Sequence, residues 1–252
     1  MKSSILLLCQ ELYEIIFSYL NLKEKLYFKF VCKKFNTLRI YSLIGVIKKT
    51  KITQNILNSF RYLEYLDLSD NKNFKTIENV PNLKYLNMTN NYYINDINNL
   101  TNLTRLNISG RNNIKYKNMN KLINLKKINA SHNFSIDHLP QDKLERLNLN
   151  NNKKITNEEL SKMDLIKLDL SSNLNISKIS HFTRLTKLII RNKTLITNDE
   201  LNKCTKLEYL NIVDNHDIHD ITNLKQLKMV IIDENSKIEH KTKRFNMTLY
   251  IV

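Results

Sequence analysis

The chain has 252 residues, and its 40 Lys and Arg against 24 Asp and Glu give a formal net charge of +16. It holds only two glycines, which excludes a glycine-rich loop that cradles phosphates. Its three cysteines, Cys9, Cys32 and Cys204, form an odd set without paired spacing, which favours a reducing compartment over a disulfide framework. No apolar run approaches the roughly 18 residues that a membrane span needs.

The first forty residues have the hydrophobic periodicity of helices. One face collects apolar side chains at helical spacing: Leu8, Leu12, Ile15, Ile16, Tyr19 and Leu20. After Asn21, a second helical pattern runs through Leu26, Phe30, Val31 and Phe35. The segment therefore predicts a small helical module at residues 1–40.

This segment resembles the F-box. Glu11-Leu12, Ile16 to Leu20 and Val31 to Phe35 match its motifs, whereas Cys9 stands where proline is usual and Lys25 where leucine is common. The resemblance implies that the module binds the Skp-type adaptor of a cullin-RING ubiquitin ligase. It also implies a set of apolar adaptor-binding residues: Leu8, Leu12, Ile15, Ile16, Leu20, Val31 and Phe35.

A secretory signal is the rival interpretation of the N-terminus. The apolar run from Ile5 to Cys9 is short for such a signal and soon meets Glu11 and Glu14. Sequons such as Asn107-Ile108-Ser109 would also place glycans on core strands if the chain were secreted. We therefore expect a cytoplasmic or nuclear protein.

The rest of the chain repeats the pattern Leu-x-x-Leu-x-Leu-x-x-Asn-x-x-Ile about every 20 residues. The first leucines of successive units are Leu63, Leu83, Leu103, Leu125, Leu144, Leu165, Leu185, Leu207 and Leu227. An earlier unit starts at Tyr41, where Ile44 aligns with Leu188. Met247, Tyr250 and Val252 align with Leu227, Val230 and Ile232 as a last strand. The sequence predicts about ten units plus a C-terminal strand over residues 41–252.

This pattern resembles the leucine-rich repeat, and the whole chain is similar to F-box proteins with such repeats. ITNEEL at 155–160, ITNDEL at 196–201 and Cys204 resemble the cysteine-containing repeat type, mixed with shorter repeats. The implied fold is an α/β solenoid with a curved parallel sheet on its concave face. Short helices or 3₁₀ turns are expected on the convex face. We expect a short helix in the 22-residue units from Tyr41, Leu103 and Leu185, and only a turn or a 3₁₀ piece in the 20-residue units.

Asparagine has two predicted structural roles. At the ninth position of most units its amide can satisfy backbone groups where the chain leaves the strand: Asn71, Asn91, Asn133, Asn152, Asn173, Asn215 and Asn235. The 22-residue units carry a basic residue there instead: Lys49, Arg111 and Lys193. Asparagine also tolerates left-handed backbone, so we expect it to replace glycine in turns.

The outward strand positions predict where the solenoid binds a target. The residue before each second leucine runs Leu43, Tyr65, Tyr85, Arg105, Lys127, Arg146, Lys167, Lys187, Tyr209 and Met229. Five successive units thus present a cation in one line with tyrosines on both sides, and Arg191 lies in a nearby column. We hypothesise an acidic or phosphorylated target protein. The alternative is a lysine-rich composition, partly paired with Asp67 and Asp169.

Other kinds of site have weak support. Dispersed charge favours salt-sensitive adhesion over specific reading of nucleic acid. His216 and His219 have zinc-like spacing within Asp214 to Asp220, but the repeat places them on a solvated turn, so we expect no metal site. We expect no cofactor and no enzymatic activity, because no nucleophile has a base at a family spacing.

Two functions remain. The resemblance implies the substrate-recognition subunit of an SCF-type cullin-RING ubiquitin ligase, in which the F-box binds the adaptor and the repeats bind the target. The alternative is a non-catalytic interaction or sequestration protein whose partner is not ubiquitinated.

Overall fold

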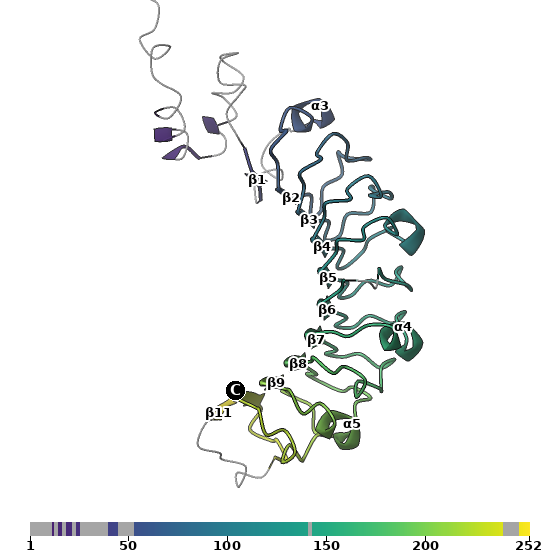
Figure 1. Cartoon of the computed structure of the whole chain (residues 1–252), viewed down its shortest axis with the longest axis vertical. Coiled ribbons are helices and arrows are strands. Elements are labelled where there is room, and N and C mark those ends of the chain that lie inside the picture. The colour runs from purple at the N-terminus through teal and green to yellow at the C-terminus, as the bar shows by residue number, and fades with distance from the viewer. Residues whose placement is uncertain are drawn as a thin grey trace, which may run out of the picture.

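The repeats form an arc. The structure is a computed structural model that describes residues 12, 15, 16, 19–21, 24, 25, 40–44, 53–140, 143–238 and 247–252. The strands follow the inner, concave edge of the arc and the short helices lie along its outer, convex edge (Figure 1). The chain is therefore the α/β solenoid that its repeat pattern predicts.

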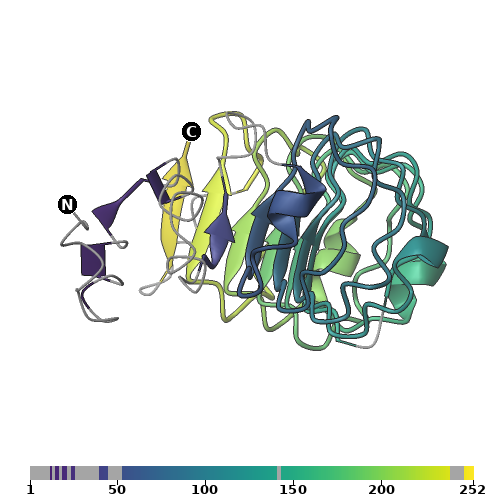
Figure 2. The ribbon, with the colours of Figure 1, turned by 90° about the horizontal axis from the view of Figure 1, so that it is seen from above.

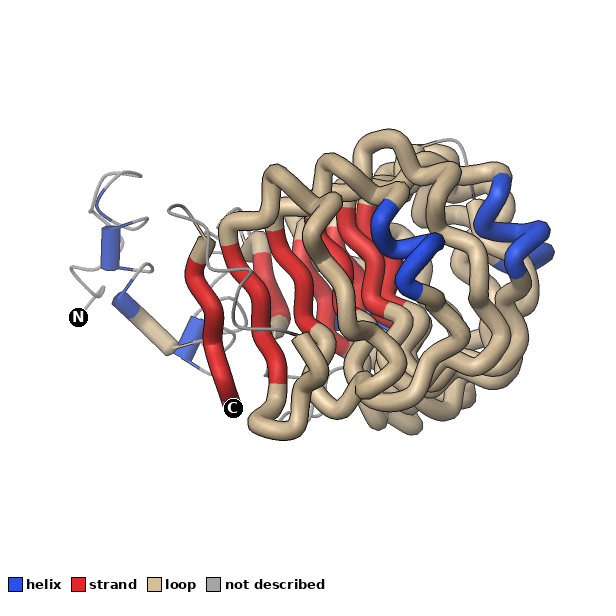
Figure 3. Tube along the Cα trace, turned by 90° about the horizontal axis from the view of Figure 1, so that it is seen from below, coloured by secondary structure: helices blue, strands red, loops and turns tan. Residues whose placement is uncertain are grey.

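A single parallel sheet lines the concave face, seen from above and below in Figures 2 and 3. Across the described residues it has eleven strands, each hydrogen-bonded to its neighbours in sequence. They are β1 (Ser42–Leu43), β2 (Tyr65–Asp67), β3 (Tyr85–Asn87), β4 (Arg105–Asn107), β5 (Lys127–Asn129), β6 (Arg146–Asn148), β7 (Lys167–Asp169), β8 (Lys187–Ile189), β9 (Tyr209–Asn211), β10 (Met229–Ile232) and β11 (Thr248–Ile251). Equivalent residues of successive repeats therefore stand side by side.

The repeated leucines form one continuous core. Each three-residue strand buries its middle residue, such as Leu86 on β3 or Leu188 on β8, and leaves its first and third residues half-buried on the concave face. This alternation follows from the two-residue period of a strand. Since every leucine packs between the repeats on either side, the stack buries what one repeat alone could not.

Short helices lie on the convex side. They are α3 (Gln54–Leu57), the 3₁₀ helix η4 (Tyr116–Asn118), α4 (Asn157–Ser161) and α5 (Asn198–Asn202). The helices α3 and α5 lie in 22-residue units, as predicted, whereas the 22-residue unit from Leu103 has only the 3₁₀ helix η4, and α4 lies in a 21-residue unit. Thr156 and Thr197 cap α4 and α5 by accepting from the backbone N–H of Glu159 and Glu200.

A buried asparagine ladder runs through the solenoid, as predicted for the ninth position. Nδ2 of Asn152 donates to the carbonyls of Ala130 and Asn133 in the preceding repeat, at 3.2 and 2.8 Å. Its Oδ1 accepts from the backbone N–H of Lys154 and Ile155. One side chain thus joins two repeats and closes a turn.

The ladder departs from the predicted positions in the longer repeats and at the end. In the repeat from Leu103, buried Asn112 one position later donates to the Met88 carbonyl, while Arg111 is exposed. The prediction for Asn235 was wrong, because this residue is exposed and Asp233 is buried instead. There Asp233 Oδ1 accepts the Asn235 N–H, which closes the last turn differently.

The eighth position of each interior repeat adopts a left-handed backbone. Its occupants, all at positive φ, are Asp70, Asn90, Gly110, His132, Asn151, Ser172, Asn192 and Asp214. Asn and Asp hold five of these eight places, and both tolerate this conformation better than other side chains. The substitution of asparagine for glycine in the turns was therefore predicted correctly.

Both end strands are shifted by one residue from the predicted register. Leu43 pairs with Leu66 and is buried, so it does not belong to the outward column, and Ile44 is exposed. At the other end, Leu249 pairs with Val230, so Tyr250 and Val252 are not the inward residues. Because strand side chains alternate, a shift of one residue exchanges the two faces.

Candidate functional site

The N-terminal module presents an apolar helical face. Leu12, Ile15, Ile16 and Tyr19 are helical, and 39, 53, 38 and 86% of their respective surfaces is exposed. Leu20 is only partly exposed and packs against the core of the solenoid. The described members of the predicted set thus comprise three exposed side chains, Leu12, Ile15 and Ile16, and one, Leu20, that packs against the core.

A capping box starts the second helical segment. Oδ1 of Asn21 accepts from the Glu24 N–H at 3.1 Å, and Glu24 Oε2 accepts from the Asn21 N–H at 2.8 Å. This reciprocal pair satisfies backbone donors at a helix start. It agrees with the prediction of a second helix after Asn21. Leu8, Val31 and Phe35 of the predicted set lie outside the described residues.

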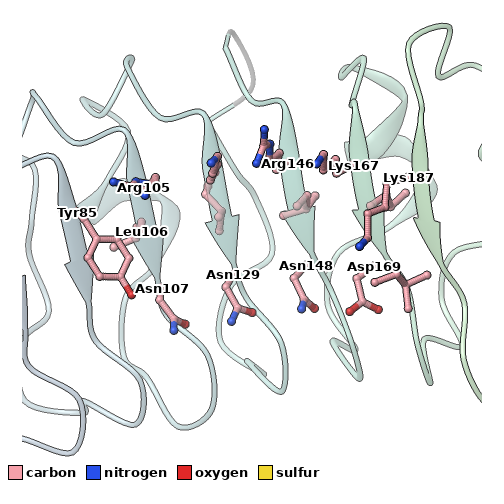
Figure 4. A pocket seen from close by; sticks show the side chains of 15 residues that line it. Tyr85, Arg105, Leu106, Asn107, Asn129, Arg146, Asn148, Lys167, Asp169 and Lys187 are labelled. Atoms are coloured by element: carbon pink, nitrogen blue, oxygen red, sulfur yellow. The ribbon is translucent and has the colours of Figure 1, made fainter. Parts of the chain in front are cut away.

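The concave face carries the predicted line of cations, which we call the cation row. Its members, each the first residue of a strand from β4 to β8, are Arg105, Lys127, Arg146, Lys167 and Lys187. They line a groove of about 440 Å³ together with Tyr85 and the strand residues beneath them (Figure 4). At about 4.8 Å between strands, the row is roughly 19 Å long.

The predicted residues Tyr65, Tyr209 and Arg191 do not line this groove. Tyr65 and Tyr209 begin β2 and β9, one strand before Tyr85 and one strand after Lys187 in the same register. Arg191 follows β8 and is exposed. The structure therefore brings the tyrosines into line with the cation row and leaves Arg191 apart from it.

The members of the cation row differ from many other charged residues of the described chain in their lack of ion pairs. Within the described part of the chain, none of its five members forms an ion pair, and the carboxylates of Asp67 and Asp169 instead accept hydrogen bonds from Ser69 and Ser171. The pKa of the Lys127 ammonium is lowered, first by desolvation and then by the positive charges of neighbouring cations. The proposed pairing with the two aspartates is thus not seen.

The column immediately before the strands behaves differently, because its charges pair from one repeat to the next. The pairs are Glu64 with Lys84, Lys126 with Glu145 and Glu208 with Lys228, with N to O distances of 2.8, 3.8 and 2.9 Å. A general excess of lysine does not explain why one column is neutralised and its neighbour is not. The two adjacent columns therefore differ in their charge pairing, and the composition alone does not account for that difference.

Arg146 adds a local cost to this row. Its Nε is buried and has no hydrogen-bond partner among the described residues. A buried, unsatisfied donor lowers the free energy of unfolding. The Nε of Arg146 therefore does not contribute to the stability of the fold.

Aromatic rings lie at both ends of the row. The guanidinium carbon of Arg105 is 5.4 and 5.5 Å from the ring centroids of Tyr65 and Tyr85, and Lys187 Nζ is 3.7 Å from that of Tyr209. These distances are typical of cation–π contacts. The pKa of the Tyr85 hydroxyl is raised by burial and by Asp67, against the opposing influence of Arg105.

A second row of polar groups lies below the cations. Figure 4 labels three of its asparagines, together with Asp169. This row, which we call the amide row, is formed by Asn87, Asn107, Asn129 and Asn148 at the ends of β3 to β6. Asp67 and Asp169 occupy the same register position on the strands at either side.

Other candidate groups do not assemble a site. The described residues contain no group of three His, Cys, Asp or Glu side chains that could hold a metal ion, and His216 lies 3.9 Å from Asp233. Burial, assisted by Glu200, raises the pKa of the Cys204 thiol to about 12. This thiol is therefore protonated at neutral pH and packs in the core.

Comparison with known proteins identifies both parts of the chain. Residues 5–38 match the F-box domain family. No curated protein matches the sequence significantly. In the part of the chain that the structure describes, no helix has the length and hydrophobicity needed to cross a bilayer.

Solved structures similar to the solenoid are leucine-rich-repeat proteins. The functional domain of InlJ from Listeria monocytogenes, which includes a cysteine ladder, is 21% identical with a TM-score of 0.55, over 77% of this chain and 45% of that one. The internalin InlF of the same species is 20% identical with a TM-score of 0.52, over 77 and 69%. A leucine-rich-repeat protein of Leptospira interrogans is 20% identical with a TM-score of 0.50, over 74 and 58%.

This chain spans less than two thirds of the InlJ domain and of the Leptospira protein. At such low identity the likeness establishes the leucine-rich-repeat fold alone. The chain thus combines an F-box domain with a leucine-rich-repeat solenoid, as its sequence resemblance predicted. Assignment of the longer repeats to the cysteine-containing type stays a prediction.

Proposed function

We propose that this chain is the substrate-recognition subunit of an SCF-type cullin-RING ubiquitin ligase. Residues 1–40 form the module that binds the Skp-type adaptor, and residues 41–252 form the solenoid that binds the target protein. The chain acts by placing a target near the ligase, without catalysis, cofactor or metal of its own. A cytoplasmic or nuclear location belongs to this proposal, because the ligase works there.

The observation that carries this proposal is the exposed apolar face of the F-box module. Leu12, Ile15 and Ile16 are helical and exposed, and they lie within the F-box match over residues 5–38. Exposed aliphatic side chains gathered on one helix are typical of a docking surface. Leu20 is assigned a different part, because it packs against the core of the solenoid and so supports the docking helix.

The concave groove is the proposed site for the target. Its unpaired cation row suits a protein segment that carries acidic or phosphorylated residues. The tyrosines at both ends provide flat, partly apolar contacts next to the charges, a composition common at protein interfaces. In this proposal the groove binds the target and the apolar face of the F-box binds the adaptor.

The alternative function is sequestration, in which the same groove holds a partner that is never ubiquitinated. It is supported by the groove itself, because the solenoid provides a binding surface whether or not the F-box module takes part. The F-box match over residues 5–38 favours the ligase receptor.

Co-purification with the adaptor tests the F-box half of the proposal. The full chain should capture a Skp-type adaptor, and Leu12→Asp or Ile16→Asp should abolish capture, because a carboxylate cannot be buried in an apolar interface without a partner. Leu174→Asp is the control, since Leu174 is also an exposed aliphatic residue but lies on the solenoid. Failure of the unmodified chain to capture the adaptor would contradict the ligase function.

Charge reversal tests the groove. Arg146→Glu combined with Lys167→Glu should abolish capture of the target, while Lys117→Glu combined with Lys206→Glu makes the same change of net charge at exposed positions away from the groove. Loss in the first variant alone supports the groove as the target site. Equal capture by both double variants would rule it out.

A further inference from the structure

The amides of the amide row are held in one orientation by the backbone. Oδ1 of Asn107, Asn129 and Asn148 accepts from the N–H two residues further on, at 3.0, 3.1 and 2.8 Å. Turning any of these amides over would set Nδ2 against that N–H, donor against donor. Each Nδ2 is therefore directed away from the turn, and the described residues provide it with no acceptor.

The two rows together make the middle of the groove a surface of donors. On β4, β5 and β6 a cation and an asparagine lie on the same face, two residues apart along each strand. The residue between them is buried and apolar. A ligand in this part of the groove meets ammonium, guanidinium and amide N–H groups, and so must supply acceptors.

Aspartates end this donor surface on both sides. Asp67 pairs in register with Asn87, and Asp169 with Asn148. Each aspartate uses Oδ1 in the same bond to the N–H two residues later, at 2.9 and 3.0 Å. Its second oxygen therefore takes the place that Nδ2 has in an asparagine, and it repels acceptors. The four strands β3 to β6 lie between the two aspartates. The distance from β3 to β6 is about 14 Å, because it spans three intervals between strands.

We infer that the groove selects an extended protein segment with about four consecutive acidic residues, flanked by residues that are not acidic. This inference rests on the proposed role of the groove in target binding. The length follows from the 14 Å between the outermost asparagines, which an extended chain covers in about four residues at roughly 3.3 Å each. Carboxylates spaced along a chain match donors spaced along two rows better than one compact, highly charged phosphate does.

Peptide binding to the full chain tests this selection. The probes are fluorescent peptides with four glutamates between Ser-Gly ends, with eight glutamates, and with two phosphoserines in place of the glutamates. The four-glutamate peptide should bind, and Asn129→Asp or Asn148→Asp should weaken it at least about tenfold, because each replaces a donor by a charged acceptor. Asp169 makes the same turn bond with a carboxylate, so the fold accommodates these changes.

Two further variants sharpen the result. Asn223→Asp makes the same change of charge at an exposed position outside the groove and should leave the affinity unchanged. Asp169→Asn extends the donor surface by one strand. It should increase the affinity for the eight-glutamate peptide more than the affinity for the four-glutamate peptide. An equal increase for both peptides would overturn the assigned length.

The outcomes separate this inference from the function on which it rests. If Arg146→Glu with Lys167→Glu abolishes binding but Asn129→Asp and Asn148→Asp do not, charge alone governs the groove. The donor selection is then wrong while the target site stands. If only the phosphoserine peptide binds, the assignment to carboxylates is wrong. If no acidic peptide binds, the selection fails together with the groove as the target site, and adaptor capture still tests the F-box separately.

Discussion

Lys187 Nζ lies 3.7 Å from the centroid of the Tyr209 ring, on the next strand of the sheet. Arg105 has the same kind of contact with Tyr85 at the opposite end of the cation row, at 5.5 Å. The outer cations are thus held by aromatic faces, whereas the described structure gives the inner ones no such contact. An anionic ligand should therefore depend most on the middle of the row.

The ring of Tyr209 should matter more than its hydroxyl. Tyr209→Phe keeps the face beneath Lys187 and should leave the affinity for an acidic peptide unchanged. Tyr209→Leu removes a contact worth about 0.5–1 kcal/mol at a partly exposed site, so affinity should fall roughly two- to fivefold. Fluorescence titration of both variants checks this. Equal losses in the two would assign the effect to the hydroxyl.

The asparagine ladder should contribute strongly to stability. Asn152→Ala removes four hydrogen bonds and leaves buried backbone groups of two repeats unsatisfied, which should lower the free energy of unfolding by about 3 kcal/mol or more. Asn150→Ala, a half-buried neighbour, should change it by less than about 1 kcal/mol. Urea unfolding measures both. Similar losses of stability in the two variants would contradict the contribution assigned to the ladder.

Glu200 should make stability depend on acid pH. Burial raises its pKa, but hydrogen bonds from the backbone N–H of Ile179 and Ser180 and from Lys203 outweigh it and lower the pKa from 4.5 to about 2. The folded-state pKa lies below the unfolded value, so this contribution is full above pH 4.5 and is lost as the pH falls toward 2.

Glu200→Gln tests that contribution because it keeps an acceptor oxygen and removes the titration. At pH 7 the unmodified chain should be more stable than this variant, by at most about 3 kcal/mol. The difference should shrink by more than half on lowering the pH to about 3. Urea unfolding at a series of pH values measures it, and a difference that stays constant would contradict the assigned pKa.

Gly110 should resist substitution. Its φ is +71°, and an added Cβ would collide with Oδ1 of Asn90, which accepts the Arg111 N–H. Gly110→Ala should therefore lower the free energy of unfolding by about 1–2 kcal/mol, from the strained backbone and the displaced hydrogen bond. Thermal unfolding measures this loss as a lower melting temperature. A melting temperature equal to that of the unmodified chain would contradict the prediction.

The interior of the fold was predictable because each interior strand pairs with a strand on both sides, and both pairings fix its register. From β2 to β9, the inward leucines and the outward columns fall where the pattern puts them. The end strands have a neighbour on one side only, and their alignment with interior repeats was wrong by one residue at each end. Leu43 to Leu57 is one residue longer than Leu188 to Leu201, so an overlay that matches the helices shifts β1.

The groove was predictable as a list of residues, but not as a chemical surface. The cation row follows from counting positions, whereas the unpaired state of its charges depends on which side chains meet across repeats. The amide orientation had a signal in the sequence, because Asn at the end of a strand is followed two residues later by Ser or Thr in Asn87, Asn107 and Asn129. An asparagine side chain at the start of a turn typically accepts a hydrogen bond from the backbone two residues later.

The most direct test of the whole account asks whether a protein held by the groove is ubiquitinated. Partners captured by the unmodified chain, but not by Arg146→Glu with Lys167→Glu, would be incubated with the chain, the Skp-type adaptor, cullin, RING subunit, conjugating enzyme and ubiquitin. We predict that these partners are ubiquitinated in the presence of the unmodified chain. They should not be ubiquitinated in the presence of Ile16→Asp, although this variant still binds them. Partners that bind the groove and the assembled ligase yet remain unmodified would contradict the account and establish sequestration instead.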